Sequence, residues 1–388
     1  MVFATRNLDA EQFGLYGKAS LCIAIAGIVT DLGLSNGLIA YSGSDKRYAA
    51  FHLQATTFLA LASSLATYLL IHFRIIFSEL QPFATLLASI ILLETACING
   101  LILSQKNYRF KALATLESGC AVISFGATVC LLLNFPSFTS LLLARAAEGA
   151  LRASTVFIME SRHYLNFAWG RDLWNYYIVK FVRHGAMQAW VQTLHSQTEI
   201  FILSYFSTNQ QLGIYERIQQ FIRVPLSASV NLVDKVALIS YSKNQHDQKI
   251  LIRLFIKFTL IIAALNISAI ALFSLIFPQL LKTFTTTTWT SELMPLWWLS
   301  IPLMLIKPIS WGINILFQGS GKATHLTISL AFLFFSTLFF GVILTPIYKT
   351  QGMIIAVTAS YLSLLIVQVL LLIKISRQRL DSALKHPI

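Results

Sequence analysis

Charged residues are scarce in this sequence, and their scarcity excludes an ordinary soluble domain. Only 12% of the residues are Asp, Glu, Lys or Arg, and 56% are hydrophobic, whereas soluble domains are about 25% charged. The mean hydropathy is +0.68. Because helices satisfy their own backbone hydrogen bonds inside a bilayer, we expect an all-α polytopic membrane protein.

Cysteine is also rare, and its placement excludes a metal centre. The four cysteines, Cys22, Cys97, Cys120 and Cys130, lie inside apolar runs, with no Cys-x-x-Cys and no histidine at ligand spacing. Structural metal sites need such clustered ligands. We therefore expect buried free thiols, no metal and no cofactor.

The excess of positive charge has a membrane explanation. The chain has 29 Lys and Arg against 16 Asp and Glu, for a formal net charge of +13. These residues are scattered between apolar runs rather than gathered on one stripe, so we expect a lipid bilayer as the partner and no nucleic acid. No cleavable signal peptide is recognisable at the N-terminus.

Apolar runs of about 20 residues, the length that spans a bilayer, recur along the whole chain. They predict eleven transmembrane helices: 13–34, 50–73, 82–104, 112–133, 137–159, 185–206, 213–237, 254–277, 293–317, 324–346 and 352–374. The one long polar connection follows the fifth run. We therefore expect an N-terminal lobe at 1–160, a cytoplasmic linker at 161–184, a six-helix C-terminal lobe at 185–375 and a basic cytoplasmic tail at 376–388.

Alternate loops differ in their basic residues, and this difference predicts the orientation, because Lys and Arg remain on the cytoplasmic side. The basic set of loops includes 160–184 and the C-terminal tail. The opposite set holds only Arg6, Arg74, Arg217, Lys282 and Lys349. The C-terminus is thus expected in the cytoplasm and, with eleven helices, the N-terminus outside.

A short repeat indicates that the two lobes are related. Phe13-Gly14-Leu15-Tyr16 returns as Leu212-Gly213-Ile214-Tyr215, at an offset of 199 residues. The helix 185–206 precedes the second copy, so the counterpart of that helix is expected upstream of Met1. We therefore expect a twelve-helix protein whose first helix is missing from this sequence. Either the chain is a natural fragment, or its start codon has been placed too late.

Polar residues inside the apolar runs are the candidate site, since charges at that depth usually line a bundle interior or a cavity. Arg145, Glu148 and Arg152 share one face of helix 137–159, and their sum is positive. The other two stripes lie on helices 213–237 and 293–317. Gln219 and Arg223 belong to the stripe on helix 213–237. The stripe on helix 293–317 contains Lys307, Trp311 and Asn314.

Other interpretations of these residues are structural. In one such interpretation, Glu148 forms an ion pair with Arg145 or Arg152 of its own helix and neutralises that arginine. Lys18 is expected to reach toward the headgroups, and Trp297 and Trp298 are expected to form an interfacial aromatic belt. Three carboxylates are candidates for carrying a coupling proton, and the sequence does not choose among them: Glu94, Glu117 and Glu199.

Ordered motifs give the chain a family resemblance. They are Leu8 to Tyr16, Asp31-Leu32-Gly33-Leu34, Gln105 to Leu113, Leu212 to Pro225, and Trp289 with the Pro295 to Gly321 region. With these motifs the chain resembles the lipid-linked polysaccharide flippases of the multidrug/oligosaccharidyl-lipid/polysaccharide export superfamily. It departs from them in lacking the first helix and in having Glu199 where the resemblance leads us to expect Asp.

The resemblance implies two pseudo-symmetric lobes around a central cavity that opens alternately to each side. The implied function is translocation of a polyprenyl-pyrophosphate-linked oligosaccharide across the bacterial inner membrane, alongside a polysaccharide polymerase and glycosyltransferases. Arg145, Arg152, Arg223 and Lys307 would bind the pyrophosphate, because guanidinium groups suit phosphate. Gln219, Trp311 and Asn314 are the candidate sugar contacts.

Three alternatives remain open at this point. One is a cation-coupled multidrug exporter of the same superfamily. Another is a membrane enzyme acting on lipid-linked sugar, which we disfavour because the loops hold no catalytic carboxylate pair; we expect no catalytic residues and no enzyme. The third is a truncated, inactive chain.

Overall fold

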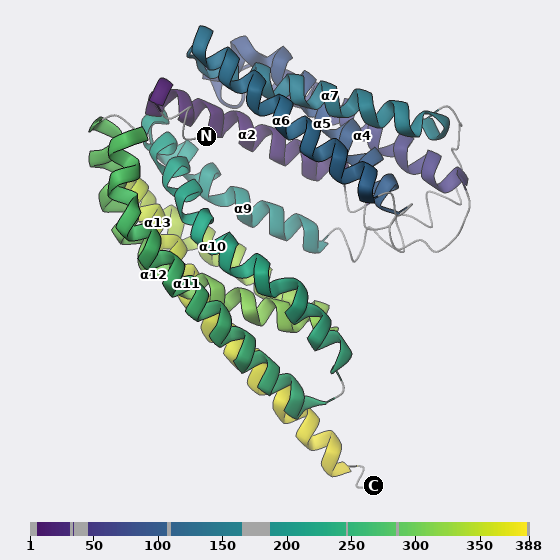
Figure 1. Ribbon diagram of the computed structural model, residues 1–388, viewed down its shortest axis with the longest axis vertical. Helices are drawn as coiled ribbons and strands as arrows, with labels where there is room; N and C mark the ends of the chain where they lie inside the picture. Colours follow the sequence, from purple (N-terminus) through teal and green to yellow (C-terminus); the bar gives the residue numbers. More distant parts are fainter. Residues whose placement is uncertain are drawn as a thin grey trace. The chain divides into compact units, whose positions relative to one another are not determined.

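The computed structural model describes residues 6–31, 34, 46–106, 110–164, 187–245, 247–284 and 287–385. All regular secondary structure in these ranges is helical, as the composition predicts. The chain divides into two compact units, Met1–Ile200 and Phe201–Ile388, and Figure 1 shows the helices of each in sequence colours. The predicted linker at 161–184 lies outside the described residues, except for the end of a helix.

Five long helices and one short one build most of the N-terminal unit. They are α2 (Ala10–Asp31), α4 (Lys46–His72), the 3-10 helix η1 (Ser78–Phe83), α5 (Ala84–Lys106), α6 (Phe110–Asn134) and α7 (Phe138–Tyr164). Helices α2, α4, α5 and α7 meet around a fully apolar core that includes Leu87, Ile90 and Leu142. The last helix of this part, α9 (Met187–Phe206), runs across the boundary between the units.

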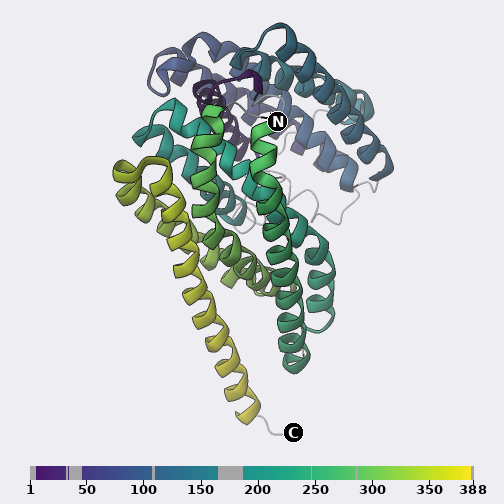
Figure 2. The ribbon, with the colours of Figure 1, turned by 60° about the vertical axis from the view of Figure 1, so that its left-hand side comes forward.

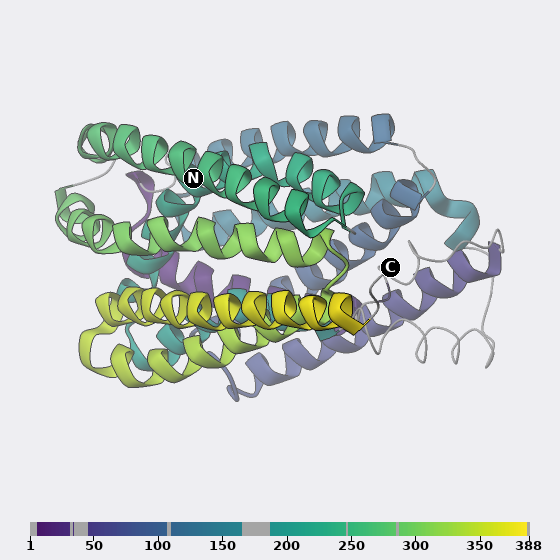
Figure 3. The ribbon, with the colours of Figure 1, turned by 90° about the horizontal axis from the view of Figure 1, so that it is seen from below.

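The C-terminal unit is a bundle of long helices that lie along one another (Figures 2 and 3). They are α10 (Asn209–Lys243), α11 (Gln248–Phe284), α12 (Thr287–Gly319) and α13 (Ala323–Lys385). Helix α10 begins at a capping box, in which Thr208 accepts from the Gln211 backbone N–H and Gln211 accepts from that of Thr208. This cap satisfies two amides that a helix start otherwise leaves unpaired.

Helix α13 consists of two arms, because the backbone leaves the helical conformation at Lys349, with φ 53° and ψ −128°. The arms fold back on each other: the Thr345 hydroxyl lies 3.5 Å from the Met353 sulfur. Figure 2 shows this reversal in the yellow-green segment. A Cβ on Gly352 would lie 2.3 Å from the Leu344 carbonyl oxygen, so the turn requires glycine at this position.

Within the described residues, each of the eleven predicted spans corresponds to a helical segment, the last two being the arms of α13. By length and apolar composition, six helices of the described chain are long and apolar enough to cross a membrane. They lie at Ala10–Asp31, Ala49–His72, Lys111–Asn134, Ile250–Thr283, Trp289–Gly319 and Thr324–Ile373. Large apolar side chains such as Phe125, Leu275 and Ile366 are more than half exposed on these helices, which suits contact with lipid.

The helix starts agree with the sequence repeat. Helix α2 begins at Ala10 and α10 begins at Asn209, which is the same 199-residue offset as that between the two Gly-x-Tyr copies. Each copy thus lies in the first two turns of its helix. The backbone of α10 stays helical through Pro225, and that of α12 through its three prolines.

Two expectations were wrong: Cys130 is exposed rather than buried, because it lies on the outward face of α6, and Trp297 is not part of an interfacial aromatic belt. Lys18 is only 5% exposed, and its ammonium is 3.0 Å from Glu79 of η1 and 5.5 Å from the Phe77 ring centroid. Trp297 is fully buried, stacks on Phe277 and donates to the Ser274 hydroxyl. Only Trp298 faces outward, because neighbours on a helix point about 100° apart.

Candidate functional site

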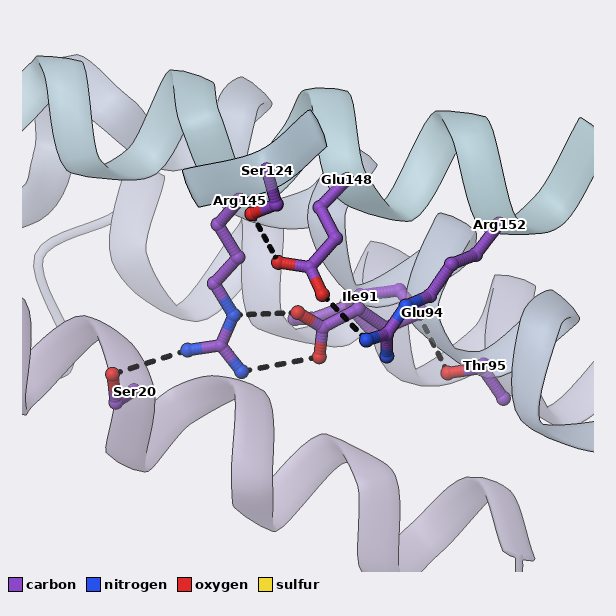
Figure 4. Close-up of polar contacts among 8 residues, drawn as sticks. All are labelled: Ser20, Ile91, Glu94, Thr95, Ser124, Arg145, Glu148 and Arg152. Carbon is purple, nitrogen blue, oxygen red and sulfur yellow. Dashed lines mark hydrogen bonds and ion pairs between the residues drawn. The ribbon is translucent and has the colours of Figure 1, made fainter. Parts of the chain in front are cut away.

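Arg145 is bound by side chains from two other helices of the N-terminal unit (Figure 4). Its guanidinium from α7 forms a two-point ion pair with Glu94 of α5: Nε donates to Oε1, and Nη2 donates to Oε2 at 3.1 Å. The third nitrogen, Nη1, donates to the Ser20 hydroxyl of α2 at 3.2 Å. Three helices are thereby joined at one planar cation.

A second ion pair follows one turn further along α7. Arg152 and Glu148 are 2.6 Å apart in an i, i+4 pair, and the Ser124 hydroxyl of α6 donates to the other oxygen of Glu148 at 2.7 Å. Figure 4 shows both carboxylates between the two arginines. Glu148 therefore neutralises Arg152 of its own helix, as one of the structural interpretations predicted.

The described cluster is electrically balanced. Sequence reasoning gave the α7 face a positive sum, but Glu94 arrives from α5 and brings the total to two cations and two anions. The four side chains are 26–33% exposed, so none is sealed in apolar surroundings. The close approach of α5 and α7 uses Gly149, where an added Cβ would lie 3.2 Å from that of Leu93.

Lys307 occupies an aromatic setting in the C-terminal unit. Its ammonium lies 5.4 Å from the ring centroid of Trp311 on the next turn of α12 and 5.4 Å from that of Tyr361 on α13. Ammonium groups are attracted to aromatic faces at this range. Sequence spacing identified the pair of Lys307 and Trp311, whereas Tyr361 comes from a helix that spacing cannot place.

Asn314 is fixed by a residue that the sequence analysis missed. Gln368 of α13 donates to the Asn314 side-chain oxygen at 3.0 Å and to the Ser310 carbonyl at 3.3 Å. Gln368 is fully buried. The available signal was an amide inside the apolar run of the last helix, since buried polar groups at membrane depth need partners.

Helix α10 carries two further candidate residues, one exposed (Arg223) and one buried (Gln219). Arg223 is exposed on its unit, and within the described part of the chain its guanidinium makes no ion pair or hydrogen bond. Gln219 is 8% exposed and donates to the Tyr215 hydroxyl at 2.8 Å. Arg217 is a buried cation that the sequence analysis left in a loop; it donates to Gln220 at 2.7 Å.

The three acidic candidates have separate environments. Glu94 belongs to the Arg145 ion pair, Glu117 is exposed on α6, and Glu199 is half-buried on α9. Among the described residues, no group of His, Cys, Asp or Glu is clustered as a metal site requires. Three of the candidate residues, Glu94, Arg145 and Arg152, thus belong to the ion-pair cluster of the N-terminal unit. Three others, Lys307, Trp311 and Asn314, lie along α12 of the C-terminal unit.

The fold is similar to that of solved transporters of the MOP superfamily. A lipid II flippase, MurJ, in an inward closed conformation is similar with a TM-score of 0.77 at 14% identity, over 96% of this chain and 83% of that chain. An inward-facing multidrug resistance MATE transporter is similar with a TM-score of 0.70 at 13% identity, over 100% and 94%. A MOP transporter from Pyrococcus furiosus gives a TM-score of 0.59 at 15% identity, over 97% and 88%.

The sequence identifies the family. A family model described as "Polysaccharide biosynthesis protein" matches residues 3–293. The chain therefore belongs to this polysaccharide biosynthesis family and is a multi-pass membrane protein with a transporter fold. No curated protein sequence matches it.

Proposed function

We propose that this protein flips a polyprenyl-pyrophosphate-linked oligosaccharide across the bacterial inner membrane, by alternating access between its two lobes. The observation that carries the proposal is membership of a polysaccharide biosynthesis family together with the fold of transporters, a lipid II flippase among them. The protein would move its substrate without chemical change. Polysaccharide polymerase and glycosyltransferases would act before and after it.

Cationic side chains would bind the pyrophosphate, and they differ in whether a carboxylate already pairs with them. Arg223 has no carboxylate beside it in the described chain, and Lys307 faces aromatic rings, so both cations suit an anionic ligand. Arg145 and Arg152 are each paired with a glutamate. For these two arginines, phosphate binding would require a change of partner, to which protonation of Glu94 would contribute by removing its charge.

Sugar contacts fall to side chains that combine an apolar face with hydrogen-bonding groups. Trp311 and Asn314 lie one turn apart on α12, beside Lys307. Gln219 is the third candidate, with its amide nitrogen already bonded to Tyr215. Its free oxygen is the part that would accept from a sugar hydroxyl.

The experiment is complementation of a strain that lacks its polysaccharide flippase. Arg223→Ala and Lys307→Ala should each lower surface glycan about tenfold at unchanged membrane abundance, because a hydrogen bond to a charged group contributes about 1.5–3 kcal/mol. The exposed Arg253 of α11 provides the control: Arg253→Ala should match the parent. Equal loss of abundance and export in the first two variants would assign these cations a structural role.

The second candidate function is cation-coupled drug export, favoured by the fold similarity to a MATE transporter. Under this alternative, expression in a drug-sensitive strain would raise the inhibitory concentration of cationic dyes, and surface glycan would stay absent in the complementation strain. Under the flippase proposal the two results are reversed.

A further inference from the structure

A pocket of about 390 Å³ opens at one end of the C-terminal unit, where three helical segments meet. They are the start of α10, the start of α12 and the break between the arms of α13. Its size lies at the lower end of the range that small-molecule sites occupy. No part of the candidate site described above lines it.

The wall of the pocket is a built feature, because the α13 break is held at two points. The Lys349 ammonium donates to the Phe206 carbonyl at the end of α9, at 3.1 Å. The Thr350 hydroxyl donates to the Gln211 carbonyl in the first turn of α10, at 3.2 Å. A left-handed φ at a lysine persists only where its surroundings impose it, and these two hydrogen bonds supply that constraint.

The lining combines hydrogen-bonding groups with an aromatic ring. Glu292 and Gln351 are exposed in it, and neither makes an ion pair or hydrogen bond in the described part of the chain. Tyr348 lines the same pocket and is 55% exposed. The pocket therefore offers a carboxylate that accepts, an amide that both donates and accepts, and an apolar ring face.

We propose that this pocket binds a sugar unit of the glycan, on the side of the membrane to which the glycan is delivered. The inference rests on the proposed function and on the orientation that the basic residues indicate, which assigns the α9–α10, α11–α12 and Lys349 turns to the outside. Sugar hydroxyls donate and accept at once, as Glu292 and Gln351 require, and the C–H face of a pyranose covers an aromatic ring such as that of Tyr348.

Other ligand classes fit the lining less well. A phosphate would meet a single ammonium, Lys349, that already donates to a carbonyl, and it would be repelled by the Glu292 carboxylate. A metal cation would find one carboxylate and a neighbouring lysine. A neutral polyol is repelled by neither charge and uses both as hydrogen-bonding groups.

The test is saturation-transfer NMR on the purified full chain in detergent, with maltose and N,N′-diacetylchitobiose as the ligands. We expect transfer to the sugar protons in the parent protein, and at least a threefold weaker effect in Glu292→Gln and Tyr348→Ala. Matched controls are Glu11→Gln in the first turn of α2 and Tyr205→Ala, whose ring is 79% exposed on α9. Both should give the parent signal.

Absence of transfer with both disaccharides, or a full parent signal in both pocket variants, overturns the proposal. Size-exclusion profiles identify a variant that has lost its fold, and the two substitutions differ enough that one folded variant suffices. Complementation separates the two proposals. Sugar binding by a protein that restores no surface glycan removes the flippase and keeps the site, whereas full export together with full transfer in both pocket variants removes the site alone.

Discussion

A guanidinium inside a membrane protein needs a partner, and Arg145 has one on a different helix. Glu94 binds it at two points, Ser20 occupies its remaining nitrogen, and about a quarter of its side chain stays exposed. A charged hydrogen bond in such a setting is stronger than one in water. Removing either member leaves the other charge half-buried, and this cost exceeds the benefit of the pair itself.

A double-mutant cycle measures this pair. Glu94→Gln and Arg145→Met should each lower the free energy of unfolding by about 2–4 kcal/mol, and the double variant should be destabilised by less than the sum, with a coupling of about 1–3 kcal/mol. Thermal unfolding in detergent, followed by tryptophan fluorescence, is the measurement. Additive losses would contradict the ion pair, and the exposed Glu11→Gln should be neutral.

Lys18 and Glu79 form a third ion pair, at the edge of the membrane-spanning part. Burial raises the pKa of the Glu79 carboxyl, but its own backbone N–H and the Lys18 ammonium outweigh burial and hold the pKa below its usual value. Since the folded-state pKa is depressed, the pair stabilises the protein above the unfolded-state pKa, and the contribution is lost as the pH falls through the folded-state pKa.

Acid titration tests this pair. Between pH 7 and pH 3 the parent should lose its stability advantage over Glu79→Gln. The loss should begin at about pH 5, roughly one pH unit above the glutamate pKa of about 4.3 in the unfolded chain, and continue as the pH falls through the lower folded-state pKa. Glu79 is 45% exposed, so solvent screening limits the difference at pH 7 to less than about 1 kcal/mol. Melting curves of both proteins across this range decide it; a constant difference down to pH 3 contradicts the assignment.

Residue spacing predicts which side chains lie on the same face of one helix. It cannot predict which side chains of a neighbouring helix contact them. The spacing of Arg145, Glu148 and Arg152 was sufficient to raise the internal Glu148 pairing. The partnership of Arg145 with Glu94 depends on how α5 is rotated against α7, which no pattern within α7 contains. The same limit explains why Gln368 was missed as the partner of Asn314 on α12.

At the scale of elements, the bilayer makes the helices predictable, because it fixes their length and apolar composition together. All eleven predicted spans correspond to helical segments. The gap between the predicted spans 293–317 and 324–346 is a turn in which Gly321 has a φ of +72°. The break between the arms of α13 at Lys349 falls in the gap between the predicted spans 324–346 and 352–374. What the sequence could not give was the close contact of Gly352 with the carbonyl of Leu344 inside that hairpin.

Substitution at Gly352 tests the hairpin. Gly352→Ala places a Cβ 2.3 Å from the Leu344 oxygen, so the arms must separate, and overpacking of this kind costs about 1–3 kcal/mol. We expect a melting temperature several degrees lower. Gly126→Ala on α6 is the control, because its Cβ would meet nothing within 4 Å; it should be neutral or slightly stabilising. Equal melting temperatures for the two variants would contradict the packing.

At the scale of the whole molecule, the chain belongs to a polysaccharide biosynthesis family, and its two helical units have the fold of solved transporters. The helix starts of α2 and α10 preserve the repeat offset of 199 residues. The same offset relates Lys18 to Arg217, which are both buried, whereas the exposed Arg223 has Ala24 at the matching position. The all-helical fold follows from composition and apolar runs, whereas these features do not identify a cargo.

Topology is predicted by the distribution of basic residues. Alkaline phosphatase fused after Lys349 should be active and fluorescent protein fused at the C-terminus should be bright, because the former works outside the cytoplasm and the latter inside. The reverse pattern would invert the orientation and place the outer pocket of the C-terminal unit on the cytoplasmic face.

The central claim is that the protein moves lipid-linked oligosaccharide, and one measurement addresses it directly. Proteoliposomes containing the purified protein and a fluorescent polyprenyl-pyrophosphate oligosaccharide are treated with a membrane-impermeant glycosidase that reaches only the outer leaflet. We predict that the protected inner-leaflet half becomes accessible with the parent protein and much more slowly with Arg223→Ala. Persistent protection of half of the lipid, equal to that in protein-free liposomes, would contradict the account.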